Sequence, residues 1–148
     1  MCGIIVAVNA EWNNNPLKSL AHRGPDFSNA IRKNNIYMGH TRLSILDLSE
    51  AGNQPMVSED GNYILVYNGE IYNHLDIRRR LISKGYFFKG TSDSETLLKS
   101  WIEWGKKAIP LLNGIFAFAI YDLNKKKIFI ARDRFGVKPQ YFYNNGST

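Results

Sequence analysis

The sequence predicts an α+β fold in which two antiparallel sheets lie face to face between outer layers of helices, a four-layer αββα sandwich. Residues 115–120 (Ile-Phe-Ala-Phe-Ala-Ile) are apolar at odd and even positions alike, which indicates a strand covered on both faces. The short polar turn at 123–127 leads into the apolar run 128–130, and so short a connection requires antiparallel pairing. Amphipathic helices can cover one face of this sheet, and a second sheet is the natural cover for the other. A two-layer α+β fold is the alternative.

Apolar, β-branched and aromatic runs predict the strands, and helical spacing of apolar residues predicts two helices. The first helix is expected over 71–83, with Leu75, Leu81 and Ile82 on its apolar face. The second is expected over 92–105, because its first residues, Ser-Asp-Ser-Glu, fit a capping box. The expected strands occupy residues 4–8, 36–43, 63–67, 115–121, 128–131 and 141–143.

Length and composition restrict the class of protein. A chain of 148 residues forms one domain and buries enough surface to fold without disulfides, and its single cysteine excludes an internal disulfide framework. No apolar stretch approaches the ~20 residues that span a bilayer, and the amino-terminal residues lack the pattern of a signal peptide. We therefore expect a cytoplasmic protein with no membrane partner.

The net charge of +6 raises the question of a nucleic-acid partner. The basic residues concentrate at 78–80, within the first expected helix, and at 125–127, in the expected hairpin turn. No DNA- or RNA-binding motif accompanies them, so we interpret them as solvated surface and expect no nucleic-acid partner. A basic nucleic-acid-binding module is the competing interpretation, and its affinity for DNA or RNA would fall steeply with salt.

The only cysteine stands at position 2, where removal of Met1 would make it the amino terminus. Mature Cys2 would then carry a thiol and a free α-amine on one residue. Because α-amino groups titrate at about 7.7–8.0, such an amine is partly neutral near neutral pH and can accept a thiol proton. The pattern favours an amino-terminal nucleophile, and a cysteine placed there by chance is the alternative.

Two further segments have residue types suited to holding a reacting group. Asn68-Gly69, expected after a strand and before a helix, offers a side-chain NH2 and a backbone N–H that a substrate can approach closely, as an oxyanion hole requires. An ordinary Asn-Gly turn is the alternative. Arg42, at the end of a strand, could bind a carboxylate with two parallel hydrogen bonds, or could form a structural ion pair.

Acidic and histidine residues are less informative on their own. Asp93 opens the second expected helix, where the helix dipole favours a carboxylate whatever its function, although it could also bind an ammonium group. The three histidines, His22, His40 and His74, have no spacing typical of a metal site, so we expect them to be structural and expect no metal. The segments 22–26 and 132–139, dense in Gly, Pro and charged residues, are interpreted as ordered loops.

The order of these motifs along the chain is more specific than any one of them. Met-Cys-Gly-Ile, His-Arg-Gly-Pro-Asp, Gly-His-x-Arg-Leu-Ser-Ile, Gln-Pro-Met, Asn-Gly-Glu-Ile-Tyr-Asn, Ser-Asp-Ser-Glu and Arg-Asp-Arg-x-Gly-x-Lys-Pro follow one another over nearly the whole chain. This sequence closely resembles the glutaminase domain of glutamine-hydrolysing asparagine synthetases, a class II glutamine amidotransferase with the N-terminal nucleophile hydrolase fold.

The resemblance implies a role for each matching residue. Cys2 would attack the side-chain amide of glutamine, with its own α-amine transferring the proton to the leaving ammonia. Asn68 and the Gly69 N–H would hold the oxyanion, and water would then hydrolyse the thioester to glutamate. In the same resemblance Arg42 would bind the substrate α-carboxylate, and Glu70 and Asp93 its α-ammonium.

The resemblance also implies what this domain would work with. The expected partners are glutamine and an ammonia-accepting synthetase domain in the same or another chain, and a homodimer is a further assembly to test. No cofactor is expected here, because ATP and Mg²⁺ would act in the synthetase domain. We expect residues 1–148 to be a type 2 amidotransferase domain that is incomplete at its carboxyl end and lacks that synthetase domain. Two alternatives to asparagine synthesis are open. The ammonia acceptor could be another compound such as a cell-surface sugar acid, or the chain could be a non-catalytic remnant that binds glutamine or a protein.

Overall fold

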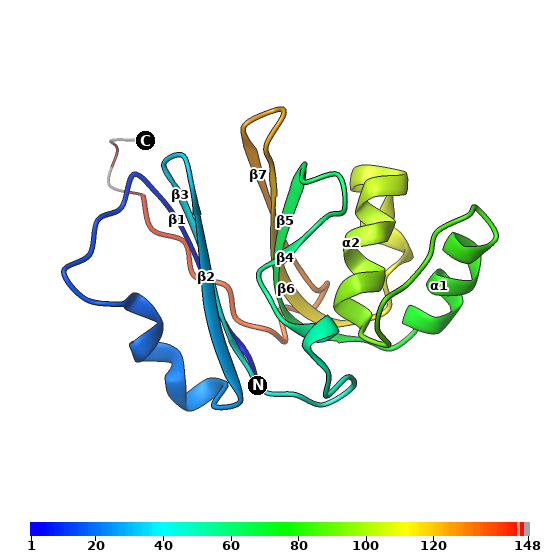
Figure 1. The fold of residues 1–148 in the computed structure, drawn as a ribbon, viewed down its shortest axis with the longest axis horizontal. Coiled ribbons are helices and arrows are strands. Elements are labelled where there is room, and N and C mark those ends of the chain that lie inside the picture. Colours follow the sequence, from blue (N-terminus) through cyan, green and yellow to red (C-terminus); the bar gives the residue numbers. More distant parts are fainter. Residues whose placement is uncertain (145, 147–148) are drawn as a thin grey trace.

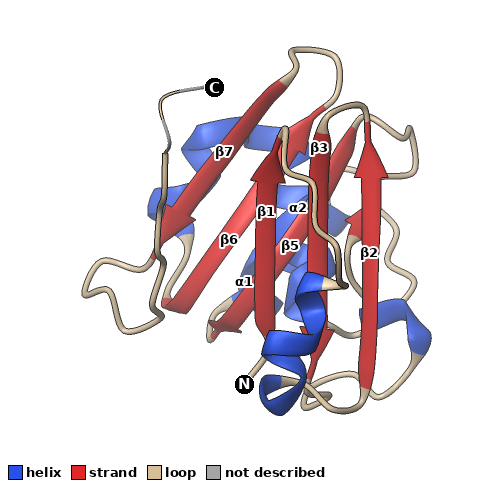
Figure 2. Cartoon of the chain, turned by 90° about the vertical axis from the view of Figure 1, so that its left-hand side faces the viewer, coloured by secondary structure: helices blue, strands red, loops and turns tan. Residues whose placement is uncertain are grey.

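The computed structural model describes residues 1–144 and 146 and consists of two antiparallel sheets packed face to face (Figure 1). The strands of the second sheet run obliquely to those of the first (Figure 2). Helices α1 (His74–Ile82) and α2 (Asp93–Trp104) cover the outer face of the second sheet, and the 3-10 helix η1 (Pro16–Arg23) lies on the outer face of the first. The first sheet has the order β1 (Gly3–Val8), β3 (Ile36–Arg42), β2 (Phe27–Lys33), and the second β4 (Met56–Val57), β5 (Tyr63–Ile71), β6 (Gly114–Asp122), β7 (Lys127–Arg132). The predicted layered fold is confirmed.

Strand β6 shows why both of its faces are apolar. Phe116 and Phe118 point towards the helices and join the core around Trp101, whereas Ala119 and Tyr121 point into the core between the sheets. Large side chains therefore fill the space under the helices, and small alanines on the other face let the two sheets approach each other. The hairpin β6–β7 is antiparallel, as its short turn predicted.

The amino-terminal part of β5 was predicted, but its end was not. The strand continues through Ile71, and α1 begins only at His74. The prediction that Asn68-Gly69 stands between a strand and a helix is therefore wrong, because both residues pair with β6 inside the strand. The apolar face predicted for α1 is also only partly right: Leu81 is buried together with Ile77, whereas Leu75 and Ile82 are exposed.

Other differences occur where a segment has little apolar surface to bury. Residues 141–143, predicted as a strand, are irregular and highly exposed, since no sheet edge pairs with them. Strand β2 was missed because its sequence is mostly polar, and β4 because it has only two residues. The 3-10 helices were not predicted: η1 includes His22 and Arg23, which were wrongly interpreted as part of a loop, and η2 (Glu50–Gly52) and η3 (Gly105–Leu111) were missed. In the described part of the chain, no helix combines the length and apolar character needed to cross a membrane.

At the start of α2, one of the two hydrogen bonds of the predicted capping box is formed and the other is not. The Ser92 hydroxyl accepts from the Glu95 N–H at 3.3 Å, as expected. The Glu95 carboxylate instead accepts from the backbone N–H groups of Lys89 and Gly90, at 2.9 and 3.0 Å. It thereby fixes the loop before α2. This loop places Asp93, the first residue of α2, beside the end of β5.

Candidate active site

One pocket lies where the start of β1, the ends of β3 and β5 and the first turn of α2 meet. All six residues predicted to act on substrate line it, although they come from segments far apart in the sequence. They are Cys2, Arg42, Asn68, Gly69, Glu70 and Asp93. The pocket also contains Asp47 and Lys138, which the sequence did not identify as site residues.

Cys2 is held beside the end of β3 by its neighbours on both strands. Gly3 pairs with Thr41, and a Cβ on Gly3 would lie 2.7 Å from the Thr41 Oγ1, so only glycine lets β1 begin this close to β3. The backbone N–H of Leu43 donates to the Cys2 Sγ at 3.4 Å, and the Arg23 Nε donates to the Cys2 carbonyl at 3.1 Å. The half-buried thiol therefore sits against a hydrogen-bond donor, and Arg23 is a positioning residue that the loop interpretation missed.

The antiparallel register sets the direction of the Gly69 N–H. Phe116, which faces Gly69 across β5–β6, directs its own N–H and C=O to Asp133, on the side away from β5. Gly69 and Phe116 are therefore a non-hydrogen-bonded pair, and the Gly69 N–H points away from β6. β4 pairs only with residues 64 and 65 of β5, so it does not reach Gly69.

The neighbours of Gly69 on the same edge of β5 have partners. The Tyr67 N–H donates to the Gln54 Oε1 at 2.6 Å, and the Ile71 N–H donates to the Asp93 Oδ2 at 2.9 Å. Among the described residues, no side chain accepts from the Gly69 N–H, and none bonds the carboxamide of Asn68. The pocket therefore contains two adjacent donors that are free to bind an oxygen atom.

Asp93 joins α2 to β5 through one carboxylate oxygen. Its Oδ2 accepts from the Tyr67 hydroxyl at 2.6 Å as well as from Ile71. Burial, followed by the charge and hydrogen bond of Asp93, raises the pKa of Tyr67 well above its usual value. The other oxygen, Oδ1, makes no hydrogen bond to the described residues, and the Glu70 side chain two residues beyond Asn68 is exposed at the same pocket. Two acidic groups are thus available to an ammonium group.

The guanidinium of Arg42 is buried and makes several contacts with the loop that follows it. Its Nη1 donates to the Ser49 carbonyl at 2.8 Å and to the Asn53 Oδ1 at 2.7 Å, and its Nη2 donates to the Asp47 carbonyl. These partners are uncharged, so Arg42 does not form the structural ion pair considered as an alternative. The Nε–H and the second Nη2 hydrogen remain for a ligand.

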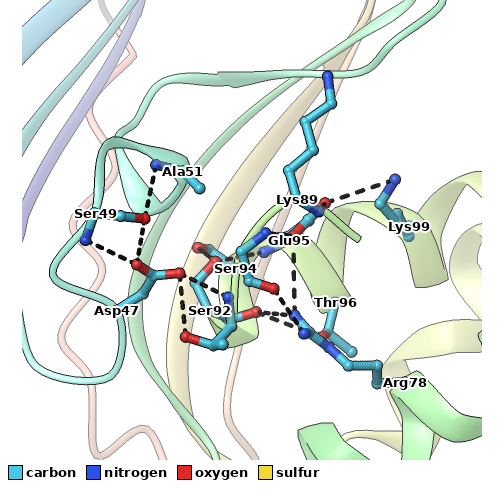
Figure 3. Close-up of polar contacts among 12 residues, drawn as sticks. Asp47, Ser49, Ala51, Arg78, Lys89, Ser92, Ser94, Glu95, Thr96 and Lys99 are labelled. Carbon is cyan, nitrogen blue, oxygen red and sulfur yellow. Dashed lines mark hydrogen bonds and ion pairs between the residues drawn. The ribbon is translucent and has the colours of Figure 1, made fainter. Parts of the chain in front are cut away.

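Asp47 connects this loop to the segment before α2 (Figure 3). Its Oδ1 accepts from the Ser49 hydroxyl at 2.6 Å and N–H at 2.9 Å, and its Oδ2 accepts from the Thr91 N–H at 2.7 Å. The Ser49 hydroxyl, followed by the Thr91 N–H, holds the pKa of Asp47 well below its usual range. Asp-x-Ser is an Asx-turn pattern, which could have indicated the local bonds but not the link to Thr91.

Arg78 supports the same segment from α1 (Figure 3). Its Nη1 donates to the Gly90 carbonyl at 2.7 Å, its Nη2 to the Ser92 carbonyl at 3.0 Å, and its Nη2 lies 3.9 Å from the Glu95 Oε2. The interpretation of residues 78–80 as solvated surface is therefore wrong for Arg78, which is an internal brace of the pocket wall.

Comparison with known proteins places this geometry in a family. A family model described as a glutamine amidotransferase domain matches residues 1–148. The chain belongs to this family. It is 45% identical over 132 residues to the glutamine-hydrolysing asparagine synthetase 3 of Bacillus subtilis (strain 168), a match that covers 88% of this chain and 21% of that protein. The predicted relation to asparagine synthetases is confirmed, and this amidotransferase domain spans about a fifth of that relative's length.

Two further matches are to proteins with other names. Amidase chyE of Penicillium rubens (strain ATCC 28089 / DSM 1075 / NRRL 1951 / Wisconsin 54-1255) is 42% identical over 126 residues, covering 85% of this chain and 19% of that protein. The solved structure of glutamine phosphoribosylpyrophosphate amidotransferase from B. subtilis, complexed with ADP and GMP, has a TM-score of 0.56 at 23% identity and covers 68% of this chain and 24% of that one. The latter likeness shows the shared fold.

A second polar cluster of the amidotransferase domain fixes the loop after β7. The Asp133 carboxylate accepts four backbone N–H groups, from Phe116 and Lys138 at one oxygen and from Phe135 and Val137 at the other, at 2.9 to 3.2 Å. Burial would raise the pKa of Asp133, but these four donors hold it below its usual value. The interpretation of 132–139 as an ordered loop agrees with this arrangement, which delivers Lys138 to the pocket.

Proposed function

We propose that this domain hydrolyses glutamine to glutamate and ammonia, with Cys2 as nucleophile after removal of Met1. The observation that supports this most directly is the pair of unengaged donors, the Asn68 carboxamide and the Gly69 N–H, in the pocket that contains the Cys2 thiol. An oxyanion hole consists of such donors, directed at the oxygen on which charge develops.

In the proposed reaction the Cys2 α-amine first accepts a proton and later donates it. The Cys2 Sγ forms a bond to the side-chain carbonyl carbon of glutamine, its proton passes to the Cys2 α-amine, and the negative oxygen is held by Asn68 and Gly69. The C–N bond then breaks, and the amine gives its proton to the departing nitrogen, which leaves as ammonia. Water attacks the γ-glutamyl thioester, releasing glutamate and restoring the thiol.

The remaining pocket residues are proposed to recognise the amino-acid end of glutamine. Arg42 would bind the α-carboxylate through its remaining hydrogens, and Glu70 with the Asp93 Oδ1 would bind the α-ammonium. The bonds between Asp93, Tyr67 and Ile71 hold that carboxylate in place before substrate arrives. Substrate binding would therefore need little rearrangement of the described side chains.

The ammonia is proposed to serve ATP-dependent amide synthesis by a synthetase domain outside residues 1–148, with aspartate as acceptor, as the similarity to an asparagine synthetase suggests. A different acceptor, such as a sugar acid, is the second candidate. A relative of similar identity is named as an amidase, chyE, and not as an asparagine synthetase. Ammonia transfer to aspartate in the presence of ATP, assayed with the complete protein, would separate the two.

The test of the glutaminase step begins with the intact mass of the purified protein. Protein that lacks Met1 should gain one stoichiometric adduct from a diazo-ketone analogue of glutamine, and excess glutamine should block it. Cys2→Ala should abolish ammonia release, and Asn68→Ala should lower kcat by about 10²–10³. Asn13→Ala, at an exposed loop position, is the control and should keep full activity. Ammonia release by Cys2→Ala would refute the proposed nucleophile, and a Met1-free protein with no adduct would favour a non-catalytic binding role.

A further inference from the structure

Lys138 is a buried cation in the pocket wall whose ammonium has no acidic partner among the described residues. The residue is only 8% exposed, yet none of the ion pairs between described residues includes it. Its Nζ lies 3.0 Å from the Met1 Sδ, a thioether that is a weak acceptor. Buried lysines are ordinarily paired, so this arrangement requires an explanation.

The backbone of Lys138 is held independently of Met1. The Asp133 carboxylate accepts the Lys138 backbone N–H at 2.9 Å and fixes the loop through three further N–H groups. Removal of Met1 would therefore leave the backbone of Lys138 in place while taking away the atom that its Nζ contacts. The new amino terminus would lie close by, because the Met1 side chain that Lys138 touches is attached to the Cys2 nitrogen by its own peptide bond.

We propose that the Lys138 ammonium acts on the mature amino terminus and favours the uncharged form of the Cys2 α-amine. A neighbouring positive charge disfavours protonation of an amine. The inference rests on the part of the proposed function that makes Cys2 the amino terminus. It assigns Lys138 as a positioning residue that acts through the amine, which must be uncharged to accept the thiol proton.

The other charges around the pocket do not replace Lys138 in this role. Arg23 is also positive, and its Nε is bonded to the Cys2 carbonyl, so it adds to the effect. The Arg42 guanidinium is bonded to uncharged loop oxygens, so its positive charge acts in the same direction. Glu70 and Asp93 favour a charged amine, but Glu70 is exposed and screened, and bound glutamine would neutralise both with its ammonium. Asp47, held by Ser49 and Thr91, is an anion that also favours a charged amine, and it is present equally in the parent and in every Lys138 variant.

The size of the effect follows from Coulomb's law. The Met1 side chain limits the separation between the Lys138 Nζ and the mature amine to roughly 8 Å. At this distance a unit charge shifts the titration midpoint by about 0.4 pH units at the dielectric constant of water and by about 1.5 units at the effective value near a protein surface. A shift in this range leaves an ordinary α-amine, whose midpoint is about 7.7–8.0, between about half and about nine-tenths uncharged at about pH 7.5.

The amine can be titrated without catalysis in a Cys2→Ala background. Alanine is small enough for Met1 to be removed, which the intact mass verifies, and it has no thiol to titrate. In protein labelled with ¹³C in the alanine methyl groups, the signal that moves between pH 6 and 10 reports the terminal amine. Adding Lys138→Met should raise its midpoint by about 0.4–1.5 pH units, whereas Lys138→Arg, which keeps the charge, should leave it near the parent value. Lys107→Met, at an exposed position without an ion pair among the described residues, is the matched control.

An equal midpoint in the parent and Lys138→Met would overturn the proposal, as would Lys138→Arg shifting as far as Lys138→Met. In the background with Cys2 restored, Lys138→Met should move the acidic limb of the kcat/KM profile to higher pH by the same amount. Failure of glutamine hydrolysis with a shifted midpoint would refute the proposed glutaminase while leaving the action of Lys138 on the terminus established.

Discussion

His40 should make the domain less stable as the pH falls from 7 to 4. It is fully buried between the sheets, with its Nε2 3.2 Å from the Tyr67 carbonyl oxygen and its Nδ1 without a partner among the described residues. Burial lowers the pKa of His40 from 6.5 to about 4, an effect that the bond to Tyr67 opposes and the charge of Arg42 reinforces. Between these two values the unfolded chain binds a proton that the folded chain does not.

The sign and the magnitude follow from this difference in proton binding. Stability rises with pH wherever the unfolded state binds more protons, so the contribution of His40 is full above pH 6.5 and declines as the pH falls towards 4. The pKa difference corresponds to roughly 3 kcal/mol between pH 7 and pH 4. The change to test is His40→Gln, because the glutamine Nε2 can keep the bond to Tyr67 without titrating.

The assay is urea unfolding at several pH values, with the free energy of unfolding compared between proteins. Wild type should lose about 3 kcal/mol more than His40→Gln between pH 7 and pH 4, and His22→Gln, at an exposed histidine, should follow wild type. The acidic residues titrate in all three proteins, so their contribution cancels in the comparison. If wild type and His40→Gln lose the same free energy, the burial argument for His40 is refuted.

Three other changes test the supports of the pocket. Asp47→Asn should lower the free energy of unfolding at pH 7 by about 1–3 kcal/mol, because the amide NH2 that it introduces must face a hydrogen-bond donor. It should also weaken glutamine binding, measured by calorimetry. The control is Asp60→Asn, in a similar turn that does not line the pocket, which should leave glutamine binding unchanged. Ser92→Ala should lower the free energy of unfolding, measured in urea, by about 1 kcal/mol, because it removes the N-cap of α2. Ser83→Ala, at an exposed position, should have a negligible effect, and equal losses in the two variants would contradict the capping role of Ser92. Gly69→Ala should abolish glutamine hydrolysis and lower the melting temperature, because its Cβ would lie 2.3 Å from the Ile115 carbonyl oxygen; wild-type turnover would contradict it.

Local patterns were sufficient to predict the layers but not the polar links between them. The unbroken apolar run 115–120 required cover on both faces, and the structure supplies helices on one side and a sheet on the other. Asp47 and Thr91, by contrast, are joined across 44 positions of the chain. Nothing in the residues around Asp47 specifies that partner, because it is brought there by the packing of α2 on β5. Arg78 was misread for the same reason, since a basic run on a helix gives no sign of which residue turns inwards.

The site residues were easier to find than the strand that carries them. Asn68-Gly69 has the composition of a turn, and only its pairing with β6 shows that it is extended. This pairing places the free N–H of Gly69 in the pocket, because every second residue of β5 directs its backbone groups to the same edge. Tyr67, Gly69 and Ile71 form that series, and its first and last members are bonded to Gln54 and Asp93.

The register of β5 on β6 therefore couples both sides of the site. With Gly69 opposite Phe116, the Gly69 N–H faces the pocket, and the Phe116 N–H faces Asp133, which holds the loop bearing Lys138. A slip of one residue would turn the Gly69 N–H into the sheet and move the Asn68 side chain to the opposite face. Glycine at position 69 stabilises the correct register over that slip, since only a residue without a Cβ fits against the Ile115 carbonyl oxygen. One strand pairing thus determines both the free donors at the pocket and the position of the cation proposed to act on its nucleophile.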